Sequence, residues 1–167
     1  VTLCKKTTKI QALQFVYLLM MINAVLRWFI YQPGHQFWIW LDPLTGGLFW
    51  IGIGTVMQAM IADVCDDDEL KRGHRNEGMF GALFGLATKL AIAVAWAFAG
   101  VLLGIIGFDA ALEANQSAET FMGMRLSMCI GAAVPALVCF IVMKFYPLTK
   151  EKAEENRKKL EEIRGEV

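Results

Sequence analysis

The stretch from Met79 to Phe108 reads MFGALFGLATKLAIAVAWAFAGVLLGIIGF and holds one charged residue, Lys89. An apolar run of this length can cross the ~30 Å hydrocarbon core of a bilayer as a helix. At about 1.5 Å per residue, Lys89 lies about 15 Å from Met79, close to the middle of that core. A lysine at this depth costs roughly 2.5–3.5 kcal/mol on insertion scales, so it normally faces a cavity or a partner charge. The stretch therefore predicts a membrane-spanning helix whose lysine marks a functional pathway.

The composition of the whole chain is that of a membrane protein. Of its 167 residues, 56% are hydrophobic, and the formal net charge is zero. Soluble domains are nearer to about 45–50% apolar. The charged residues crowd into 5–9, 63–77 and 144–166 and are scarce elsewhere. Basic residues are matched by acids and are not interleaved with aromatic side chains in a polar domain, so we expect no nucleic-acid partner.

Three further stretches are apolar and long enough to span a bilayer. We predict an all-α membrane protein with four transmembrane helices at about 10–31, 44–64, 79–107 and 121–146, followed by a charged tail helix. Pro147 ends the fourth span, because proline removes a backbone donor and clashes with the preceding turn. The chain then divides into a transmembrane region, 1–147, and a tail, 148–167. The tail is either a solvated surface helix, which we favour, or a latch on the loops at the same membrane face.

The connections between the predicted spans alternate in charge. Lys and Arg occur before the first span, in the connection 65–78 and in the tail, and they are absent from 32–43 and 108–120. Positively charged connections remain on the cytoplasmic side of a membrane. We therefore predict that both termini are cytoplasmic.

The connection between the second and third spans is rich in charge and reads ADVCDDDELKRGHRNEG, residues 62–78. Two interpretations are open. It is a solvated loop of mixed charge, which the pattern alone favours, or a cytoplasmic gate whose ion pairs close one side of a carrier. The candidate gate residues are Asp63, Asp66, Glu69, Arg75 and Glu77. The spacing lacks the central Gly and terminal Glu of a calcium loop.

The remaining polar residues form no catalytic or metal pattern. We find no nucleophile–base arrangement, phosphate loop or zinc spacing, so we expect a protein that is not an enzyme and holds no metal. We interpret the four cysteines as free thiols. Asp63 is the only acid that we place within reach of a span, and we expect Arg27 and Arg125 to extend toward the outer membrane surface.

Small residues recur at four-residue spacing in the third span. Gly81 and Gly85 form one pair, Gly100 and Gly104 form another, and alanines at 87, 91, 95 and 99 form a stripe. Such residues let helix backbones approach closely. The stripe fits ordinary static packing, which we favour, or helices that slide in a carrier.

From Ala62 to Lys89, and again at 100–110 (GVLLGIIGFDA) and 144–152 (KFYPLTKEK), the chain resembles a known transporter family. This family is the glycoside-pentoside-hexuronide:cation symporters, which are melibiose-carrier-like members of the major facilitator superfamily. Its pattern is ADxxDxxE, a short basic stretch, R-x-E-G and an apolar helix with a lysine. The matching residues are Asp63, Asp66, Glu69, Arg75, Glu77, Gly78 and Lys89. The resemblance covers about 44–152 well and the first span loosely.

The resemblance implies the last four helices of a twelve-helix fold, and hence a fragment, which a chain beginning at Val1 also suggests. It implies cation-coupled transport of a small molecule, a sugar or glycoside, by alternating access in a bacterial inner membrane. Lys89 then matches a lysine near the sugar and cation sites, and charged positions at the family's cytoplasmic gate are matched by Asp63, Asp66, Glu69 and Arg75. The coupling cation, Na⁺ or H⁺, is expected to bind mainly to carboxylates of the missing amino-terminal half, with no other cofactor.

Two departures from the family pattern bear on the substrate. Melibiose-type members have polar residues five and four positions before the lysine, where this chain has Phe84 and Gly85. A sugar-contacting aromatic of these members falls at Gly54. The loss of polar contacts keeps open a lysolipid-type symporter of the same wider group. An alternative from a different class is a four-helix membrane scaffold that transports nothing, in which Lys89 pairs with an acid of a partner protein.

Overall fold

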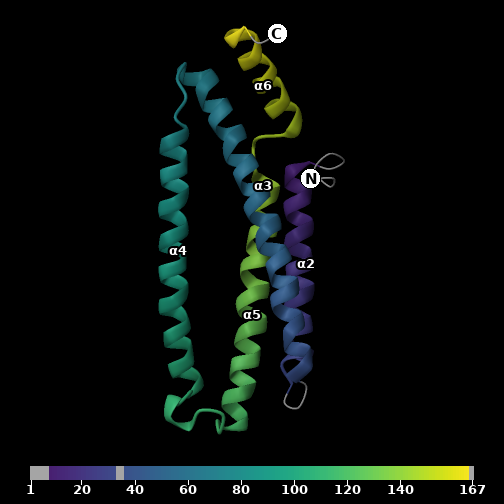
Figure 1. The fold of residues 1–167 in the computed structure, drawn as a ribbon, viewed down its shortest axis with the longest axis vertical. Helices are drawn as coiled ribbons and strands as arrows, with labels where there is room; N and C mark the ends of the chain where they lie inside the picture. The colour runs from purple at the N-terminus through teal and green to yellow at the C-terminus, as the bar shows by residue number, and fades with distance from the viewer. Residues whose placement is uncertain (1–7, 33–35, 166–167) are drawn as a thin grey trace.

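The computed structural model describes residues 8–32 and 36–165, and within these ranges the chain forms helices and short connections without strands (Figure 1). Cys4, Lys5, Lys6 and His35 lie outside the described residues. The long helices are α2 (Lys9–Ile30), α3 (Leu41–Arg72), α4 (Glu77–Ile106), α5 (Ala118–Val142) and α6 (Lys150–Arg164). Short 3-10 segments adjoin them at η1 (Gln36–Trp40), η2 (Ala110–Leu112) and η3 (Met143–Phe145). The predicted all-α fold with a carboxyl-terminal helix is confirmed.

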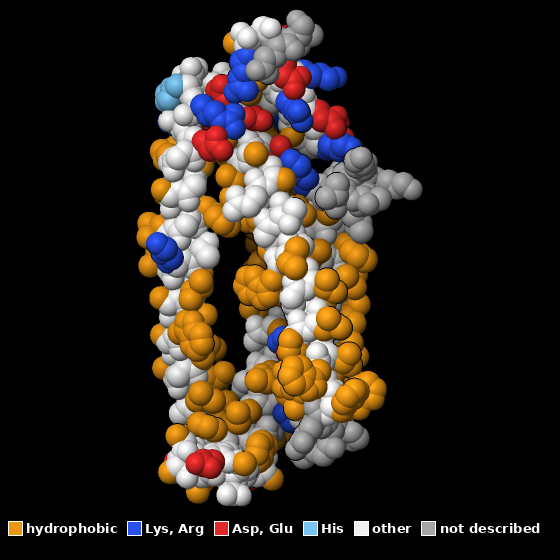
Figure 2. Space-filling view, viewed as in Figure 1, with side chains coloured by type: hydrophobic (Ala, Val, Ile, Leu, Met, Phe, Trp, Pro, Cys, Tyr) orange, Lys and Arg blue, Asp and Glu red, His pale blue; other side chains and the backbone are white. Residues whose placement is uncertain are grey.

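Helices α2, α3, α4 and α5 are each long and apolar enough to cross a membrane. The shortest, α2, has 22 residues, which is about 33 Å of helix and enough for the ~30 Å hydrocarbon core. Most of their large hydrophobic side chains are exposed. Figure 2 shows these side chains along the length of the helices, while most charges gather at one end. The prediction of four spans is confirmed, and the protein is an integral membrane protein.

The ends of the helices follow from local sequence. Thr8 caps α2, because its Oγ1 accepts from the backbone N–H of Gln11 at 3.2 Å while the Gln11 side chain accepts from the N–H of Thr8 at 3.2 Å. Ser117 caps α5 by accepting from the N–H of Thr120 at 3.1 Å. Gly107 ends α4 with a left-handed φ of 78°, a conformation that glycine adopts without strain.

Helix α3 continues well beyond the span predicted to end at Val64. Residues 65–72, the α3 extension, are helical although six of them are charged. Two ion pairs at i,i+4 spacing support this helix, Asp67 with Lys71 at 2.5 Å and Asp68 with Arg72 at 2.7 Å. Gly73, with a φ of 74°, ends the helix. Because six charged residues in two turns would be very costly in hydrocarbon, we expect the extension to project past the membrane.

Among the described residues, the tightest packing is that of α2 against α5 on one side and α3 on another (Figure 1). Leu13 of α2 is fully buried, and it lies in a cluster with Tyr17, Val56, Met60 and Ala136. Small side chains permit the close approach, since van der Waals contact rather than exclusion of water drives helix association in lipid. This three-helix group is the frame on which the polar ends of the molecule are built.

Helix α4 stands apart from the three-helix group along most of its length. It has no buried residue, and Figure 2 shows an open gap between it and the neighbouring helices. A Cβ atom at Gly81, Gly85, Gly100 or Gly104 would meet nothing within 4 Å, and the alanine stripe is exposed. The static packing that we favoured for these small residues is therefore not seen within the part of the chain that the structure describes.

One close contact joins α4 to α5 at the end opposite the charges. A Cβ atom added at Gly123 would lie 2.6 Å from Cγ2 and 3.3 Å from Cγ1 of Ile106. Ile106 is β-branched and therefore stiff, so it cannot yield cheaply. Glycine is required at this position if α4 and α5 are to meet.

We expect Gly123→Ala to destabilise the complete protein by about 1–3 kcal/mol, the usual range for overpacking. The measurement is unfolding in detergent micelles, followed by the loss of helical circular dichroism. Gly131→Ala on the same helix is the matched control, because a Cβ atom there meets nothing within 4 Å. Adding Ile106→Ala to Gly123→Ala should recover part of the loss. Equal stabilities for the variants at 123 and 131 would contradict the close approach.

Candidate functional site

Charged side chains gather where α2 begins, α3 ends and α6 lies, a region that we name the charged end (Figures 1 and 2). All five residues predicted to form a cytoplasmic gate lie in this region, on α3, on α4 or in the turn between them. The structure divides them into Arg75 with three carboxylates that it contacts, and one further carboxylate that pairs with α2.

Arg75 sits in the turn between α3 and α4 and contacts three carboxylates. Its Nη1 donates to Asp66 Oδ1 at 3.0 Å and to Glu69 Oε2 at 3.2 Å, and its Nε donates to Glu77 Oε2 at 2.8 Å. Asp66 and Glu69 are three residues apart and so share a face of α3. Glu77 opens α4, where a negative charge favours the helix amino terminus. One guanidinium thus ties the end of α3 to the start of α4, and we name these four residues the Arg75 cluster.

The opposite charges in this cluster stabilise the ionised form of each other's side chains. The carboxylates raise the pKa of Arg75 above its ordinary value, and the hydrogen bond to Glu77 is the largest cause. The pKa of Glu69 is lowered, first by its hydrogen bond from Arg164 of α6 and also by that from Arg75. Both groups are therefore charged at neutral pH. The Arg75 side chain is 37% exposed, so solvent screens each pair and the cluster acts as a set of weak contacts.

Asp63 is separate from the Arg75 cluster and pairs with Lys9 at the start of α2. Lys9 Nζ donates to the two Asp63 carboxylate oxygens at 2.8 and 2.7 Å and to the carbonyl oxygen of Ala59 at 3.1 Å. This pair closes α2 against α3 at the charged end. The sequence did not predict it, because pairing across helices depends on a register that hydropathy does not specify.

A pocket of about 420 Å³ lies beside this pair. It is bounded by the start of α2, by α3, by the segment before α6 and by α6 itself. Its charged lining residues are Lys9, Asp63, Asp66, Lys150, Glu154 and Arg157. Among the residues of 8–32 and 36–165, no group of His, Cys, Asp or Glu is arranged to hold a metal ion.

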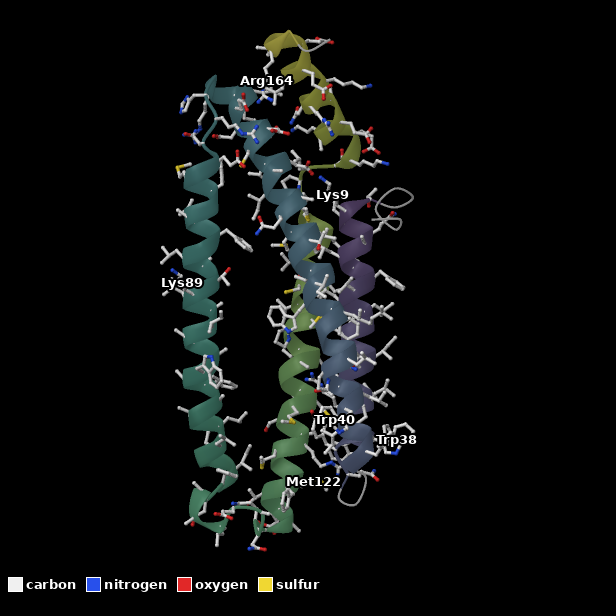
Figure 3. All side chains as sticks on the ribbon, viewed as in Figure 1. Lys9, Trp38, Trp40, Lys89, Met122 and Arg164 are labelled. Carbon is white, nitrogen blue, oxygen red and sulfur yellow. The ribbon has the colours of Figure 1, made fainter. Side chains whose placement is uncertain are left out.

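Lys89 lies midway along α4, far from the charged end. Its side chain is exposed, and Figure 3 shows it on the side of α4 away from α2, α3 and α5. No described carboxylate lies within 4.0 Å of its ammonium group. The neighbouring Thr88 hydroxyl donates to the carbonyl oxygen of Phe84 at 2.8 Å, so its donor is hydrogen-bonded within α4. Lys89 is thus presented to whatever covers the outer side of α4.

A second pocket, of about 360 Å³, opens between α3 and α4 near the charged end. Its lining is apolar apart from one tyrosine hydroxyl. The residues are Met57, Met60, Ile61, Val64, Phe80, Leu83, Phe84, Ala87, Met143 and Tyr146. Phe84 and Ala87 lie within two turns of Lys89, but the pocket is on the side of α4 that faces α3, whereas Lys89 points away from α3 (Figure 3).

The end opposite the charged end holds a polar cluster that corrects two expectations. Asp42, in the first turn of α3, accepts from Arg27 Nε at 2.7 Å and from the Tyr31 hydroxyl at 2.8 Å. Asp63 is therefore not the only acid within reach of a span, and Arg27 is paired rather than simply extended toward the membrane surface. Arg125 lies over the Trp28 ring, 4.3 Å from its centroid. Asp42 falls in the predicted connection 32–43, because it precedes Pro43 and the predicted span.

We expect Arg27 and Asp42 to be energetically coupled. In the complete protein, a double-mutant cycle of Arg27→Gln and Asp42→Asn should give a coupling of roughly 0.5–3 kcal/mol, because the two residues are in contact and only partly exposed. Detergent unfolding of the four proteins measures it. The matched control is Arg157 with Glu161, an ion pair of the same type whose arginine is 75% exposed and whose coupling should be much smaller. Additive effects at 27 and 42 would contradict the pairing.

Comparison with known proteins gives one family. The family described as MFS/sugar transport protein matches residues 1–150. The chain is 33% identical over 114 residues to "Glucuronide carrier protein homolog" of Escherichia coli (strain K12), an alignment that covers 65% of this chain and 24% of that protein. It is 29% identical over 118 residues to "Uncharacterized symporter YjmB" of Bacillus subtilis (strain 168), with 68% and 25% covered.

A third relative carries a different substrate name. The chain is 26% identical over 108 residues to "Sodium-dependent lysophosphatidylcholine symporter 1" of Xenopus tropicalis, with 64% of this chain and 20% of that protein covered. No solved structure is significantly similar. The chain thus spans about a quarter of the length of the first curated relatives that it matches.

Proposed function

The chain belongs to the MFS/sugar transport protein family, and from this premise we propose that it is the carboxyl-terminal part of a cation-coupled secondary transporter. Sugars or glycosides are the proposed substrates, and transport proceeds by alternating access, with two halves rocking about a site near the membrane midplane. Relatives named as a glucuronide carrier and as a symporter support this proposal. The scaffold alternative finds no support among these relatives.

The observation that carries the proposal is the position of Lys89. It is the one charged residue between Met79 and Phe108, it lies midway along α4, and it faces away from the other helices of the chain (Figure 3). A charge at this depth is tolerated when it faces a water-filled cavity or an opposite charge. We propose that Lys89 faces the transport pathway and pairs with carboxylates of the amino-terminal half.

This pairing gives a mechanism for coupling. A cation that binds those carboxylates competes with Lys89 for their negative charge and changes the charge balance of the site. If cation occupancy changes the affinity for the substrate, substrate occupancy must change the affinity for the cation by the same factor. The coupling ion is Na⁺ or H⁺, and its ligands lie mainly outside this chain.

The charged end supplies the proposed gate on the cytoplasmic side of a bacterial inner membrane, with both termini on that side. The positively charged connections support this orientation. The Arg75 cluster and the Lys9–Asp63 pair are sets of partly exposed ion pairs. Contacts of this kind are individually weak, so they can break and re-form as the carrier changes its facing.

In the complete carrier, Lys89→Ala should reduce cation-driven uptake to the level of empty vesicles while membrane insertion remains intact. The reason is that the charge balance of the site is lost. Uptake of a radiolabelled aryl β-glucuronide and of a radiolabelled disaccharide under imposed Na⁺ or H⁺ gradients measures it. Thr88→Ala, one residue away with a hydroxyl bonded on its own helix, is the matched control and should transport normally. Normal cation-driven uptake by the Lys89 variant would defeat the proposed role.

Asp63→Lys should shift the carrier toward one facing, because it places two ammonium groups together where Lys9 and Asp63 now pair. The measurement uses Ala87→Cys as a reporter in a background free of other cysteines, since Ala87 lines the pocket between α3 and α4. Its labelling by a membrane-impermeant maleimide is compared from each side of the membrane. Lys9→Asp combined with Asp63→Lys should restore the original pattern.

The control for charge reversal is Glu119→Lys, at an exposed position at the opposite end of the molecule. It should leave labelling of the reporter unchanged. Unchanged labelling in the Asp63→Lys variant as well would show that this pair takes no part in gating.

A second candidate substrate class is a lysolipid. The apolar lining of the pocket between α3 and α4 favours it, as does the relative named for lysophosphatidylcholine. An acyl chain could occupy an apolar wall that offers a sugar few hydrogen bonds. Uptake of radiolabelled lysophosphatidylcholine beside that of the two sugar probes separates these candidates.

A further inference from the structure

The carboxyl-terminal helix α6 docks on the α3 extension. Asn156 Nδ2 donates to Asp67 Oδ1 at 2.9 Å, and Arg164 Nη2 donates to the two carboxylate oxygens of Glu69 at 2.8 Å each. Figure 1 shows α6 beside the end of α3, and Figure 3 shows Arg164 at that end. Of the two interpretations of the tail, the structure agrees with a latch rather than with the solvated surface helix that we favoured.

One face of α6 makes this contact. Asn156, Leu160 and Arg164 recur every four residues and therefore share a face. Asn156 is 6% exposed and Leu160 is 5% exposed, whereas most of the remaining side chains of the helix are exposed. The buried leucine anchors the helix, and the flanking asparagine and arginine direct it to two acids of the α3 extension.

The carboxylate of Glu69 joins this docking contact to the Arg75 cluster. It accepts from Arg164 of α6 and, through Oε2, also from Arg75 Nη1 at 3.2 Å. The Glu69 side chain is 17% exposed, so two guanidinium groups hold one largely enclosed carboxylate. If Arg164 were removed, Glu69 would keep only the longer contact to Arg75 and could turn away from it.

We infer that α6 acts as a clasp in which Arg164 and Asn156 are positioning residues for the cytoplasmic gate. This inference rests on the proposed function of the Arg75 cluster as that gate. The end of a helix beyond the membrane frays unless other groups hold it. By holding Asp67 and Glu69, the clasp fixes the α3 extension and keeps Asp66 and Glu69 in reach of Arg75. Release of α6 would favour opening of the charged end.

The experiment uses the complete carrier with the Ala87→Cys reporter and a membrane-impermeant maleimide applied from the side of the charged end. Arg164→Ala should raise the labelling rate by roughly two- to fivefold, as expected for the loss of one partly exposed ion pair. Arg164→Lys should recover most of the original rate because it keeps a positive charge. Asn156→Ala should raise the rate to a smaller extent.

Lys159→Ala is the matched control, since Lys159 is on the same helix, pairs at 2.5 Å with Glu155 of α6 itself and does not line the pocket beside the Lys9–Asp63 pair. It should not change the labelling rate. Arg75→Ala should raise the rate on its own, and adding Arg164→Ala should raise it little further, because both arginines act through Glu69. Such non-additivity is expected of residues that share a partner.

The outcomes separate the clasp from the gate. If Arg75→Ala raises labelling while Arg164→Ala behaves as Lys159→Ala does, the clasp is wrong and the gate stands. If neither Arg75→Ala nor Arg164→Ala raises labelling, the proposed gate is wrong, and the clasp, which rests on that gate, is wrong as well. If Arg164→Ala only lowers the amount of folded protein, at an unchanged labelling rate per folded molecule, α6 is a structural support and the inference is overturned.

Discussion

The high free energy of a charge in hydrocarbon organises this chain. A charged side chain at the centre of a bilayer costs roughly 2.5–3.5 kcal/mol on insertion scales. Nearly all charges therefore lie at the two ends of the helices, and there they meet. Arg27 pairs with Asp42 at one end, and Lys9 pairs with Asp63 at the other. Lys89 is the exception, and its position is the basis of the role in the transport pathway that we propose for it.

The same constraint explains why α4 differs from the other spans. In lipid, helices associate through close packing of small residues and through polar contacts. Helices α2, α3 and α5 have both, with Ala12, Ala24 and Ala136 buried and Asn23 donating to Thr45 at 2.9 Å. Helix α4 carries the small residues but has no buried side chain. In the proposed carrier, its glycine and alanine face is available to helices that this chain does not contain.

The sequence predicted the fold from few signals. Hydropathy gave the four spans, and the alternation of Lys and Arg gave a proposed orientation. The α3 extension was interpreted as a loop because its residues are charged, although pairs such as Asp68 with Arg72 hold it helical. The sequence favoured a solvated α6 over a docked one. The reason is that the tail has few apolar residues, of which Leu160 is one, and a docked helix normally buries an apolar face.

The contacts between helices were the main structural feature that could not be predicted from the sequence. Asp42 with Arg27, and Glu69 with Arg164, depend on the register of separate helices, which a single sequence does not specify. The direction of Lys89 was equally undetermined. Helix α4 is apolar around its whole circumference, so no polar face indicated which side the lysine would take.

The side chains of α4 also limit what this chain can contribute to substrate recognition. A buried polar ligand requires a hydrogen-bond partner for each of its donors and acceptors. Beside Lys89, the Thr88 hydroxyl is already bonded to Phe84, and the pocket between α3 and α4 is almost wholly apolar. If the substrate is a sugar, most of its hydrogen bonds must come from outside this chain, which then supplies a charge and an apolar wall. If the substrate is a lysolipid, that wall is available to its acyl chain, whereas Lys89 lies on the opposite side of α4.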